Sequence, residues 1–256
     1  MRNLCIDIGN TRTKIAIFNN SEVIDYWSVD NGNDLKLSDN VKDIDGAILC
    51  TTIDVDKSLI DTFTQLPCNI KEILTWQTPI PVENCYSTPQ SLGMDRLAAV
   101  IGAHAIKPDN DILVIDCGTA ITYDFINASG QYLGGNISPG VALRFKSLHA
   151  FTAHLPLVSE KGELPSHGIS TETAIRCGVI DGTKYEIEGF IKAMVVKYPN
   201  LLVFLTGGNE FDFDVSIKKR IFADKLLVPR GLDSILQYLT TTKTYSVISS
   251  TDVYHP

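Results

Sequence analysis

The sequence predicts an α/β protein made of two duplicated halves. In "LCIDIGNTRTKIAIF" (residues 4–18) and again in "LVIDCGTAITYDF" (residues 113–125), a strand ends in Asp-x-Gly and a second strand follows. The apolar residues at the start of each stretch alternate with others, which indicates half-buried strands. Each half contains three meandering strands, followed by helices that alternate with further strands, the pattern of an α/β fold.

In the first half, the strands are expected at about 3–9, 14–19, 22–28, 46–52 and 70–76. Leu59, Phe63 and Leu66 recur at helical spacing and predict a helix at 54–66. The proline-rich stretch 78–90 is expected to be a loop. The stretch 94–106 is almost free of charge after its third residue, so it predicts a buried helix.

The second half begins after the break at 107–111, which divides the chain into an N-terminal lobe, 1–107, and a C-terminal lobe, 108–256. Its strands are expected near 111–117, 120–126, 130–136, 201–208 and 225–229, and its helices near 140–153, 171–197, 213–222 and 232–241. The Asp-x-Gly turn falls at the same place in both lobes, which indicates gene duplication.

Composition narrows the function classes. The chain has 256 residues, of which 44% are hydrophobic, and a formal net charge of −8. Phosphate backbones attract basic surfaces, so we expect no nucleic-acid partner. No apolar run approaches the roughly 20 residues that span a bilayer, and Asp7 follows the N-terminus too soon for a signal peptide. We therefore expect a cytoplasmic protein with no membrane partner, whose six scattered cysteines serve as reduced, small hydrophobic residues.

The two turns suit the binding of phosphates. Glycine permits close approach of the backbone, and successive turn N–H groups bind anions. Carboxylates such as Asp7 and Asp116 would repel phosphates unless a cation lies between them, and Mg²⁺ suits that role because it bridges a carboxylate and phosphate oxygens. No Walker lysine motif occurs in the chain. A Gly pair, 207–208, at the end of a later strand offers a further ligand site at a sheet edge.

The segment "CYSTPQSLGMDRLAAV" (residues 85–100) places Asp95 and Arg96 at the start of the apolar helix. One interpretation is purely structural, because an aspartate favours the positive end of a helix dipole. The other is chemical: Arg96 would bind a substrate carboxylate with its forked guanidinium group, and Asp95 would accept a proton from a substrate hydroxyl. The residues alone leave both interpretations open.

Four stretches together resemble the type III pantothenate kinases. They are "DIGNTRTKIAIF", "YSTPQSLGMDRLAA", "DCGTAITYDFINASGQYLGGNISPG" and "ISTETAIRCG", and the resemblance runs from residue 4 to at least 208. The combination of G-x-D-R, D-x-G-T-A-x-T-x-D and G-G-x-I-x-P-G is more specific than any one of these motifs. The family belongs to the acetate/sugar kinase, actin and heat-shock chaperone superfamily, so the resemblance implies two duplicated ribonuclease-H-like domains with an active-site cleft between them.

The resemblance also implies roles for particular residues. Asp95 would be the general base, and Asp116 would bind an activating monovalent cation, K⁺ or NH₄⁺. Asp7 would face Mg²⁺ through water. ATP would be bound by Asp7, Ile8, Gly9, Asn10, Thr11, Arg12, Thr13, Lys14 and Thr119. Pantothenate would be bound by Tyr86, Gly93, Met94, Asp95, Arg96 and Thr171.

The implied reaction is phosphorylation of the primary hydroxyl of pantothenate by ATP, the first step of coenzyme A biosynthesis, carried out by a homodimer. Two alternatives stay open. Another small alcohol could be the acceptor, although Arg96 beside Asp95 favours a substrate with both a carboxylate and a hydroxyl. The chain could instead be an ATP-binding accessory factor for transcription, but it has no basic patch and its catalytic motifs are intact. The sequence departs from the family at Ala16, where glycine is frequent, and at Ser170, where asparagine is common.

Overall fold

The computed structural model describes residues 1–30, 41, 43–209, 211 and 213–242. The described chain forms two compact units. The first contains Met1–Pro108, Gly130–Tyr132 and the chain from Leu226 to the end of the last helix; the second contains Asp109–Ser129 and Leu133–Lys225. The expected boundary after residue 107 lies close to the first of these divisions. The last helix differs from expectation, because it groups with the first unit, and segment 243–256, which we assigned to the C-terminal lobe, lies outside the described residues.

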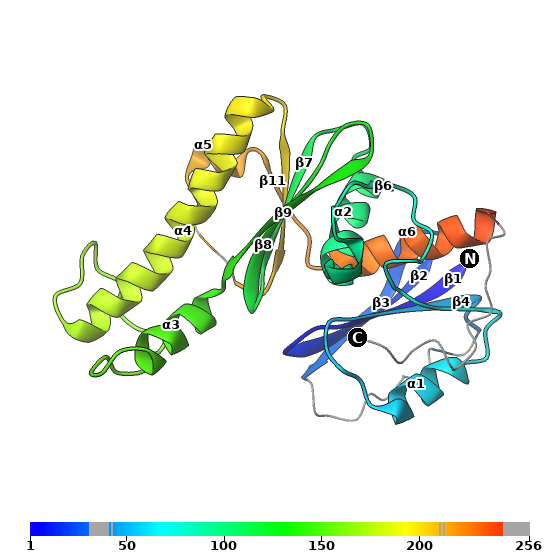
Figure 1. Ribbon diagram of the computed structural model, residues 1–256, viewed down its shortest axis with the longest axis horizontal. Helices are drawn as coiled ribbons and strands as arrows, with labels where there is room; N and C mark the ends of the chain where they lie inside the picture. The colour runs from blue at the N-terminus through cyan, green and yellow to red at the C-terminus, as the bar shows by residue number, and fades with distance from the viewer. Residues whose placement is uncertain (31–40, 42, 210, 212, 243–256) are drawn as a thin grey trace. The chain divides into compact units, whose positions relative to one another are not determined.

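The first unit is built on a five-stranded sheet with the order β3-β2-β1-β4-β5 (Figure 1). Its strands are β1 (Arg2–Ile8), β2 (Arg12–Asn19), β3 (Glu22–Asp30), β4 (Gly46–Thr51) and β5 (Ile70–Ile73). β1, β2 and β3 pair antiparallel, whereas β4 pairs parallel with β1 and with β5. A short strand, β6 (Glu83–Asn84), pairs with residues 131–132 at the start of β9 (Gln131–Pro139).

Side chains that alternate along β1 enter two different layers. Leu4, Ile6 and Ile8 pack in one core cluster with Phe63 of α1 (Lys57–Thr64). On the opposite face, the Asn3 side chain donates a hydrogen bond of 2.6 Å to Asp233 of α6 (Leu227–Thr242). Figure 1 shows α1 and α6 on opposite sides of this sheet.

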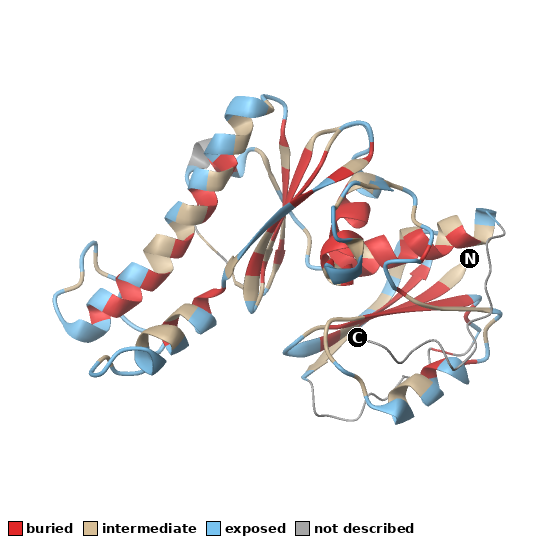
Figure 2. Cartoon of the chain, in the orientation of Figure 1, coloured by how far each residue is buried: buried red, intermediate tan, exposed pale blue. Residues whose placement is uncertain are grey.

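Helix α2 (Met94–Ile106) is buried, as its sequence predicts (Figure 2). It packs against α6 closely enough that two glycines are required. A Cβ at Gly102 would lie 2.2 Å from the carbonyl oxygen of Leu227, and one at Gly231 would lie 1.8 Å from the carbonyl oxygen of Ala98. This contact joins the last helix to the first unit.

The second unit repeats the strand order of the first. Its strands run β11-β10-β7-β8-β9, with β7 (Ile112–Cys117) antiparallel to β8 (Ala120–Ile126) and parallel to β10 (Leu202–Gly207). β11 (Ile221–Ala223) pairs parallel with β10. The equivalent first-unit order is β5-β4-β1-β2-β3, so the described sheets confirm the duplicated α/β architecture.

Helices complete the second unit. α3 (Val141–Ala150) follows β9, the long α4 (Thr171–Lys197) packs against the sheet, and α5 (Val215–Lys218) is a single turn. Ile187 and Ile191 of α4 pack in one cluster with Leu113 and Ile115 of β7. The side chains of Val114 and Asp116 alternate with these and therefore face the other side of β7.

Two sequence expectations near the end of the chain are wrong. The stretch 225–229 is not a strand; α6 begins at Leu227, and the strand, β11, comes before it. The expected helix at 213–222 is reduced to α5. A short apolar run does not distinguish a strand from a buried helix, and Pro229 is tolerated here because the first turn of a helix needs no amide donor at that position. Burial of Leu227 and Leu232 favours the helix.

Candidate active site

The first Asp-x-Gly turn joins β1 to β2. The N–H of Gly9 donates a hydrogen bond of 3.1 Å to the carbonyl oxygen of Arg12, which closes the turn. Asp7 is paired with Lys14 in the register of the two strands, and Lys14 Nζ lies 3.5 Å from Asp7 Oδ2. The Asp7 side chain is only 5% exposed, whereas that of Lys14 is 25% exposed. The buried carboxylate of Asp7 thus forms an ion pair with Lys14 near the end of β1.

The other predicted ATP-binding residues of this hairpin fall into two groups. Ile8 and Thr13 are buried, and Asn10 and Thr11 are exposed at the tip of the turn. Arg12 is also exposed, but it is held by β3: its Nε lies 2.9 Å from Ser28 Oγ and 3.4 Å from an oxygen of Asp30. Asn10 and Thr11 are therefore accessible to solvent at the tip.

The second turn, between β7 and β8, contains Asp116, Gly118 and Thr119. Thr119 is exposed, and its carbonyl oxygen accepts a hydrogen bond of 3.0 Å from the N–H of Gly140. The carboxylate of Asp116 lies against β10, because a Cβ at Gly207 would be 2.7 Å from Asp116 Oδ1. The glycine of the "TGG" stretch therefore leaves room for this carboxylate.

Residues 93–96 form the start of α2. Gly93 is the N-cap residue, and it lacks a side chain that could cap the helix. Asp95 lies in the first turn, where its Oδ1 accepts a hydrogen bond of 2.8 Å from the N–H of Arg96. A Cβ at Gly93 would lie 2.6 Å from that same oxygen. Met94 is buried, so Gly93 and Asp95 form the accessible edge of the motif.

Arg96 faces the aromatic ring of Tyr86. The guanidinium carbon lies 5.9 Å from the ring centroid, and Arg96 is 7% exposed. The Tyr86 ring in turn stacks on Tyr132, with centroids 6.1 Å apart. Tyr132 is fully buried, and its carbonyl oxygen accepts a hydrogen bond of 3.0 Å from the N–H of Cys85. Tyr86 and Arg96 therefore lie side by side.

The buried thiol of Cys50 lies near both Asp7 and Asp95. Burial raises the pKa of Cys50, and the charges of Asp7 and Asp95 raise it further, so both carboxylates lie within electrostatic range of this thiol. Cys50 is also the register partner of Asp7 in the parallel pair of β1 and β4. The first unit therefore brings the first turn and the Asp95-Arg96 pair to the same end of its sheet.

Thr171 lies on a different element, as the exposed first residue of α4. The preceding residue, Ser170, caps this helix by accepting a hydrogen bond of 3.2 Å from the N–H of Thr173. Serine thus fulfils the capping role at the position where asparagine is common in the family.

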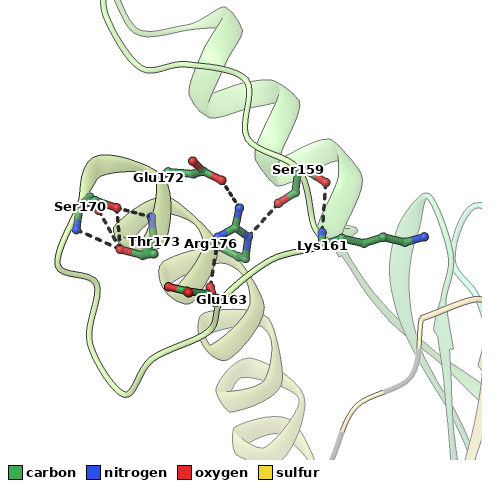
Figure 3. A network of polar contacts seen from close by, with 7 residues as sticks. All are labelled: Ser159, Lys161, Glu163, Ser170, Glu172, Thr173 and Arg176. Carbon is green, nitrogen blue, oxygen red and sulfur yellow. Dashed lines mark hydrogen bonds and ion pairs between the residues drawn. The ribbon is translucent and has the colours of Figure 1, made fainter.

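A buried arginine holds the loop before Thr171 to α4 (Figure 3). Arg176 Nε donates to the carbonyl oxygen of Ser159 at 3.0 Å, and Nη1 donates to that of Glu163 at 3.1 Å. Nη2 pairs with the carboxylate of Glu172. Gly162, between the two loop carbonyls, has φ +147°, and a Cβ there would lie 2.5 Å from the guanidinium carbon. These contacts define the conformation of the segment that leads to Thr171.

A cavity of about 410 Å³ opens beside the "TGG" stretch in the second unit. Its lining includes Thr206, Gly207 and Asn209 with the apolar side chains of Phe211 and Ile221. Thr206 is 4% exposed, and among the described residues its hydroxyl has no hydrogen-bond partner. The mixed apolar and polar lining suits a planar organic group with a few polar atoms.

Sequence reasoning missed Cys50 and Tyr132 as neighbours of the site, whereas Thr206 belongs to the "TGG" stretch, 206–208, that ends a strand. Nothing local in the sequence distinguishes Cys50 or Tyr132 from ordinary core residues, because their positions depend on strand pairing. The described residues include no cluster of three or more His, Cys, Asp or Glu side chains able to hold a metal ion.

No helix in the described part of the chain is both long enough and apolar enough to cross a membrane.

Comparison with known sequences gives a consistent result. A family model described as type III pantothenate kinase matches residues 3–193. A protein named type III pantothenate kinase from Phocaeicola vulgatus is 50% identical over 238 residues, covering 92% of this chain and 98% of the relative. One from Bacteroides fragilis has the same identity and coverage. A relative of the same name from Flavobacterium johnsoniae is 37% identical over 240 residues, covering 92% of this chain and 97% of the relative.

Solved structures are similar in fold. A conserved protein from Campylobacter jejuni, assigned to the Baf family of transcriptional activators, gives a TM-score of 0.59 at 23% identity, covering 93% of this chain and 99% of that chain. A ROK family protein from Streptococcus pneumoniae, in complex with sucrose, gives a TM-score of 0.50 at 12% identity, covering 96% of this chain and 100% of that chain. At these identities the likeness concerns the fold alone, and it agrees with two duplicated ribonuclease-H-like domains.

Proposed function

The chain belongs to the type III pantothenate kinase family, and we propose how its residues carry out the family's reaction. The enzyme phosphorylates the primary hydroxyl of pantothenate with ATP and yields 4′-phosphopantothenate, the first step of coenzyme A biosynthesis. The observation that carries the residue assignment is the grouping of Asp95, Arg96 and Tyr86 at the end of the sheet that also presents Asp7.

Asp95 is the general base in this proposal. Its carboxylate is partly exposed at the N-terminal turn of α2, and its Oδ1 is fixed by the N–H of Arg96 at 2.8 Å. The second oxygen is the one that accepts the hydroxyl proton of pantothenate. Phosphoryl transfer has a loose transition state, so positioning of the hydroxyl contributes more than proton removal.

Arg96 binds the carboxylate of pantothenate, and Tyr86 forms an adjoining wall of the pocket. The burial of Arg96 supports this role, because a forked guanidinium group binds a carboxylate most strongly where water is excluded. A sugar has no carboxylate for this arginine. The same arrangement therefore favours pantothenate over the small-alcohol alternative. Gly93 and Met94 shape the pocket, and Thr171 at the start of α4 supplies a further substrate hydroxyl contact.

ATP phosphates bind to the turns that contain Gly9 and Thr119, and the cavity beside Gly207 receives another part of the nucleotide. Residues 7–14 and Thr119 provide the phosphate contacts, with Asn10 and Thr11 exposed at the tip of the first turn. The buried carboxylate of Asp7 fits Mg²⁺ bound to ATP, whose remaining ligands would be phosphate oxygens and water. When bound, Mg²⁺ supplies neutralisation of the phosphate charge.

Asp116 binds the activating monovalent cation, K⁺ or NH₄⁺. The space that a Cβ at Gly207 would fill, 2.7 Å from Asp116 Oδ1, supports the fit, as does the buried hydroxyl of Thr206 opposite Asp116 in the strand register. Carboxylate and hydroxyl oxygens are suitable ligands for a hard cation of low charge.

We further propose a homodimer that works in the cytoplasm. Large apolar side chains are exposed on β9, α3 and the loop that follows, including Ile137 at 65%, Phe151 at 87% and Ile169 at 83%. A second copy of the chain would cover them, which light scattering measures directly. All six cysteines are free thiols, and this supports a reducing compartment.

The proposal is tested by an ADP-release assay with ATP, Mg²⁺ and pantothenate, with and without K⁺, beside a panel of sugars. Turnover that depends on pantothenate and increases with K⁺ supports the substrate and the cation site. Turnover with a different alcohol alone would overturn the pocket assignment. A folded protein that binds ATP without any turnover would favour the accessory-factor alternative.

A further inference from the structure

An ion pair in the second unit connects α3 to α4. Arg144 Nη2 lies 2.6 Å from Glu186 Oε2, and the two side chains are only 21% and 26% exposed. The other carboxylate oxygen of Glu186 accepts a hydrogen bond of 2.8 Å from the hydroxyl of Tyr123, on β8. Tyr123 is 2% exposed, and its ring stacks on Phe190 at 4.2 Å. The carboxylate is therefore held from two sides.

The same arginine holds the end of β9. Its Nε donates a hydrogen bond of 2.7 Å to the carbonyl oxygen of Pro139, and its Nη2 donates one of 2.8 Å to Ser138 Oγ. These two residues belong to the G-G-x-I-x-P-G motif, residues 134–140. Arg144 thus fixes the motif with its planar fork, which a lysine ammonium cannot reproduce.

The motif ends against the second hairpin. The N–H of Gly140 donates to the carbonyl oxygen of Thr119 at 3.0 Å. A Cβ at Gly140 would lie 2.3 Å from the carbonyl oxygen of Gly118 and 2.4 Å from that of Thr119. The backbone of the motif therefore directly supports the turn that presents Thr119.

We propose that the Arg144–Glu186 pair, together with Tyr123, is a positioning network for the second phosphate-binding hairpin. The network acts through Ser138, Pro139 and Gly140 and keeps Thr119 in the geometry needed for ATP. None of its three members touches a reacting atom. The proposal rests on the assignment of Thr119 to ATP phosphates.

The pKa of Glu186 agrees with this geometry. Partial burial by itself raises this pKa, but hydrogen bonds from Arg144, Ser138 and Tyr123 outweigh that effect and lower it below its ordinary value. The Glu186 carboxylate is therefore ionised at neutral pH, and in this form it can accept hydrogen bonds from several donors at once.

The decisive substitution is Arg144→Lys, which keeps the charge but loses the fork. We expect the dissociation constant for a fluorescent ATP analogue and the KM for ATP to rise about 10-fold, the scale of one lost charge-assisted hydrogen bond. We expect the KM for pantothenate to change less than about twofold, because the pantothenate contacts of the first unit are untouched. A loss of general structural integrity would not produce this split.

Two further variants and a control complete the experiment. Glu186→Gln and Tyr123→Phe should weaken ATP binding in the same direction, and Arg144→Lys combined with Glu186→Gln should be less than additive because both act on one network. Tyr123→Phe removes a single hydroxyl, so it provides the test if an Arg144 variant does not fold. Lys192→Gln, which breaks the Lys192–Glu188 pair on the same helix, should leave ATP binding unchanged.

The proposal is overturned if the folded variants bind the ATP analogue as well as the wild type does, or if both KM values increase equally. ATP-analogue binding does not depend on the acceptor alcohol. Failure of the wild type to use pantothenate would therefore contradict the proposed function and would leave this measurement interpretable.

Discussion

The guanidinium carbon of Arg96 lies 5.9 Å from the centroid of the Tyr86 ring, and the backbone N–H of the same arginine donates a hydrogen bond of 2.8 Å to Asp95 Oδ1. A buried cation, an aromatic wall and a partly exposed carboxylate thus come from a helix start and a loop that lie only ten residues apart in sequence. In the proposed function, this grouping binds an acceptor that has both a carboxylate and a hydroxyl. Each of its parts can be changed separately.

Asp95→Asn should abolish most turnover and retain ATP binding. In the wild type, the N–H of Arg96 donates a hydrogen bond of 2.8 Å to Asp95 Oδ1. Asparagine keeps an oxygen for this bond, but it cannot accept the substrate proton. We expect kcat to fall roughly 10²- to 10⁴-fold, the range of general-base catalysis. Single-turnover kinetics and ATP-analogue titration measure the two quantities. Near-normal turnover would exclude Asp95 as the base.

Arg96→Lys should raise the KM for pantothenate about 10-fold or more, with the KM for ATP unchanged. Lysine retains the charge, but it loses the fork that matches a carboxylate and the planar face toward Tyr86. Steady-state kinetics with each substrate varied separately provide the measurement. Arg220→Lys is the control. In the described part of the chain, the guanidinium group of Arg220 donates hydrogen bonds to the backbone carbonyl oxygens of Pro199 and Leu201, which have no role in the proposed site. Equal changes in both KM values would argue against carboxylate binding.

Gly93→Ala should decrease kcat without unfolding the protein. The backbone at Gly93 has φ −60°, which alanine adopts freely, so the new methyl group acts only through its collision with Asp95 Oδ1 at 2.6 Å. Gly178→Ala on α4 is the matched control, since its Cβ would meet nothing within 4 Å. That control should be neutral or slightly stabilising. Unchanged kcat in Gly93→Ala would show that the position of Asp95 is uncritical.

Asp116→Asn should remove the activation by K⁺. The amide retains the shape but lacks the charge that offsets the cation. The measurement is the ratio of rates in KCl and in choline chloride of equal ionic strength, for the wild type and the variant. A variant that K⁺ still activates would place the cation elsewhere.

The stability of the first unit should depend on the titration of Asp233. Burial raises its pKa above the ordinary 3.8, although Asn3, Gln237, the N-terminal amine and Arg230 each lower it in part. Because the folded state binds the proton more tightly, this group contributes stability below the ordinary pKa, and the contribution is lost as the pH rises through the folded pKa.

Urea unfolding between pH 4 and 8, compared for the wild type and Asp233→Asn, measures this dependence. The variant should show a smaller decrease in the free energy of unfolding as the pH rises. Identical slopes for the two proteins would contradict the assignment.

Much of the fold was predictable because its signals are local. The turns at Asp7 and Asp116 and the helix that starts at Met94 lie within about two residues of their expected positions. Alternation, glycine and helical spacing act over a few residues, and a single chain displays them directly. For the candidate site, the sequence places Asp95 and Arg96 together at the start of this helix, and their roles stay a prediction.

The end of the chain was not predictable on these grounds. "KLLVP" has the composition of a strand, yet Leu227 and Val228 enter a helix whose glycine, Gly231, packs on the backbone of Ala98. That contact joins residues more than a hundred positions apart, and no local pattern reports it. The support of Tyr86 by Tyr132 was missed for the same reason.

The sequence by itself determined the duplicated α/β order, the two Asp-x-Gly turns and the position of Asp95 and Arg96 together at the start of a helix. Each of these is set by short-range sterics and hydrogen bonding. The tertiary structure decided which residues lie around them: Cys50 beside Asp7, Tyr132 against Tyr86, and Arg144 with Glu186 at the end of β9. Strand register and helix packing bring these residues together over long separations, and such contacts form only when the whole chain buries its apolar surface.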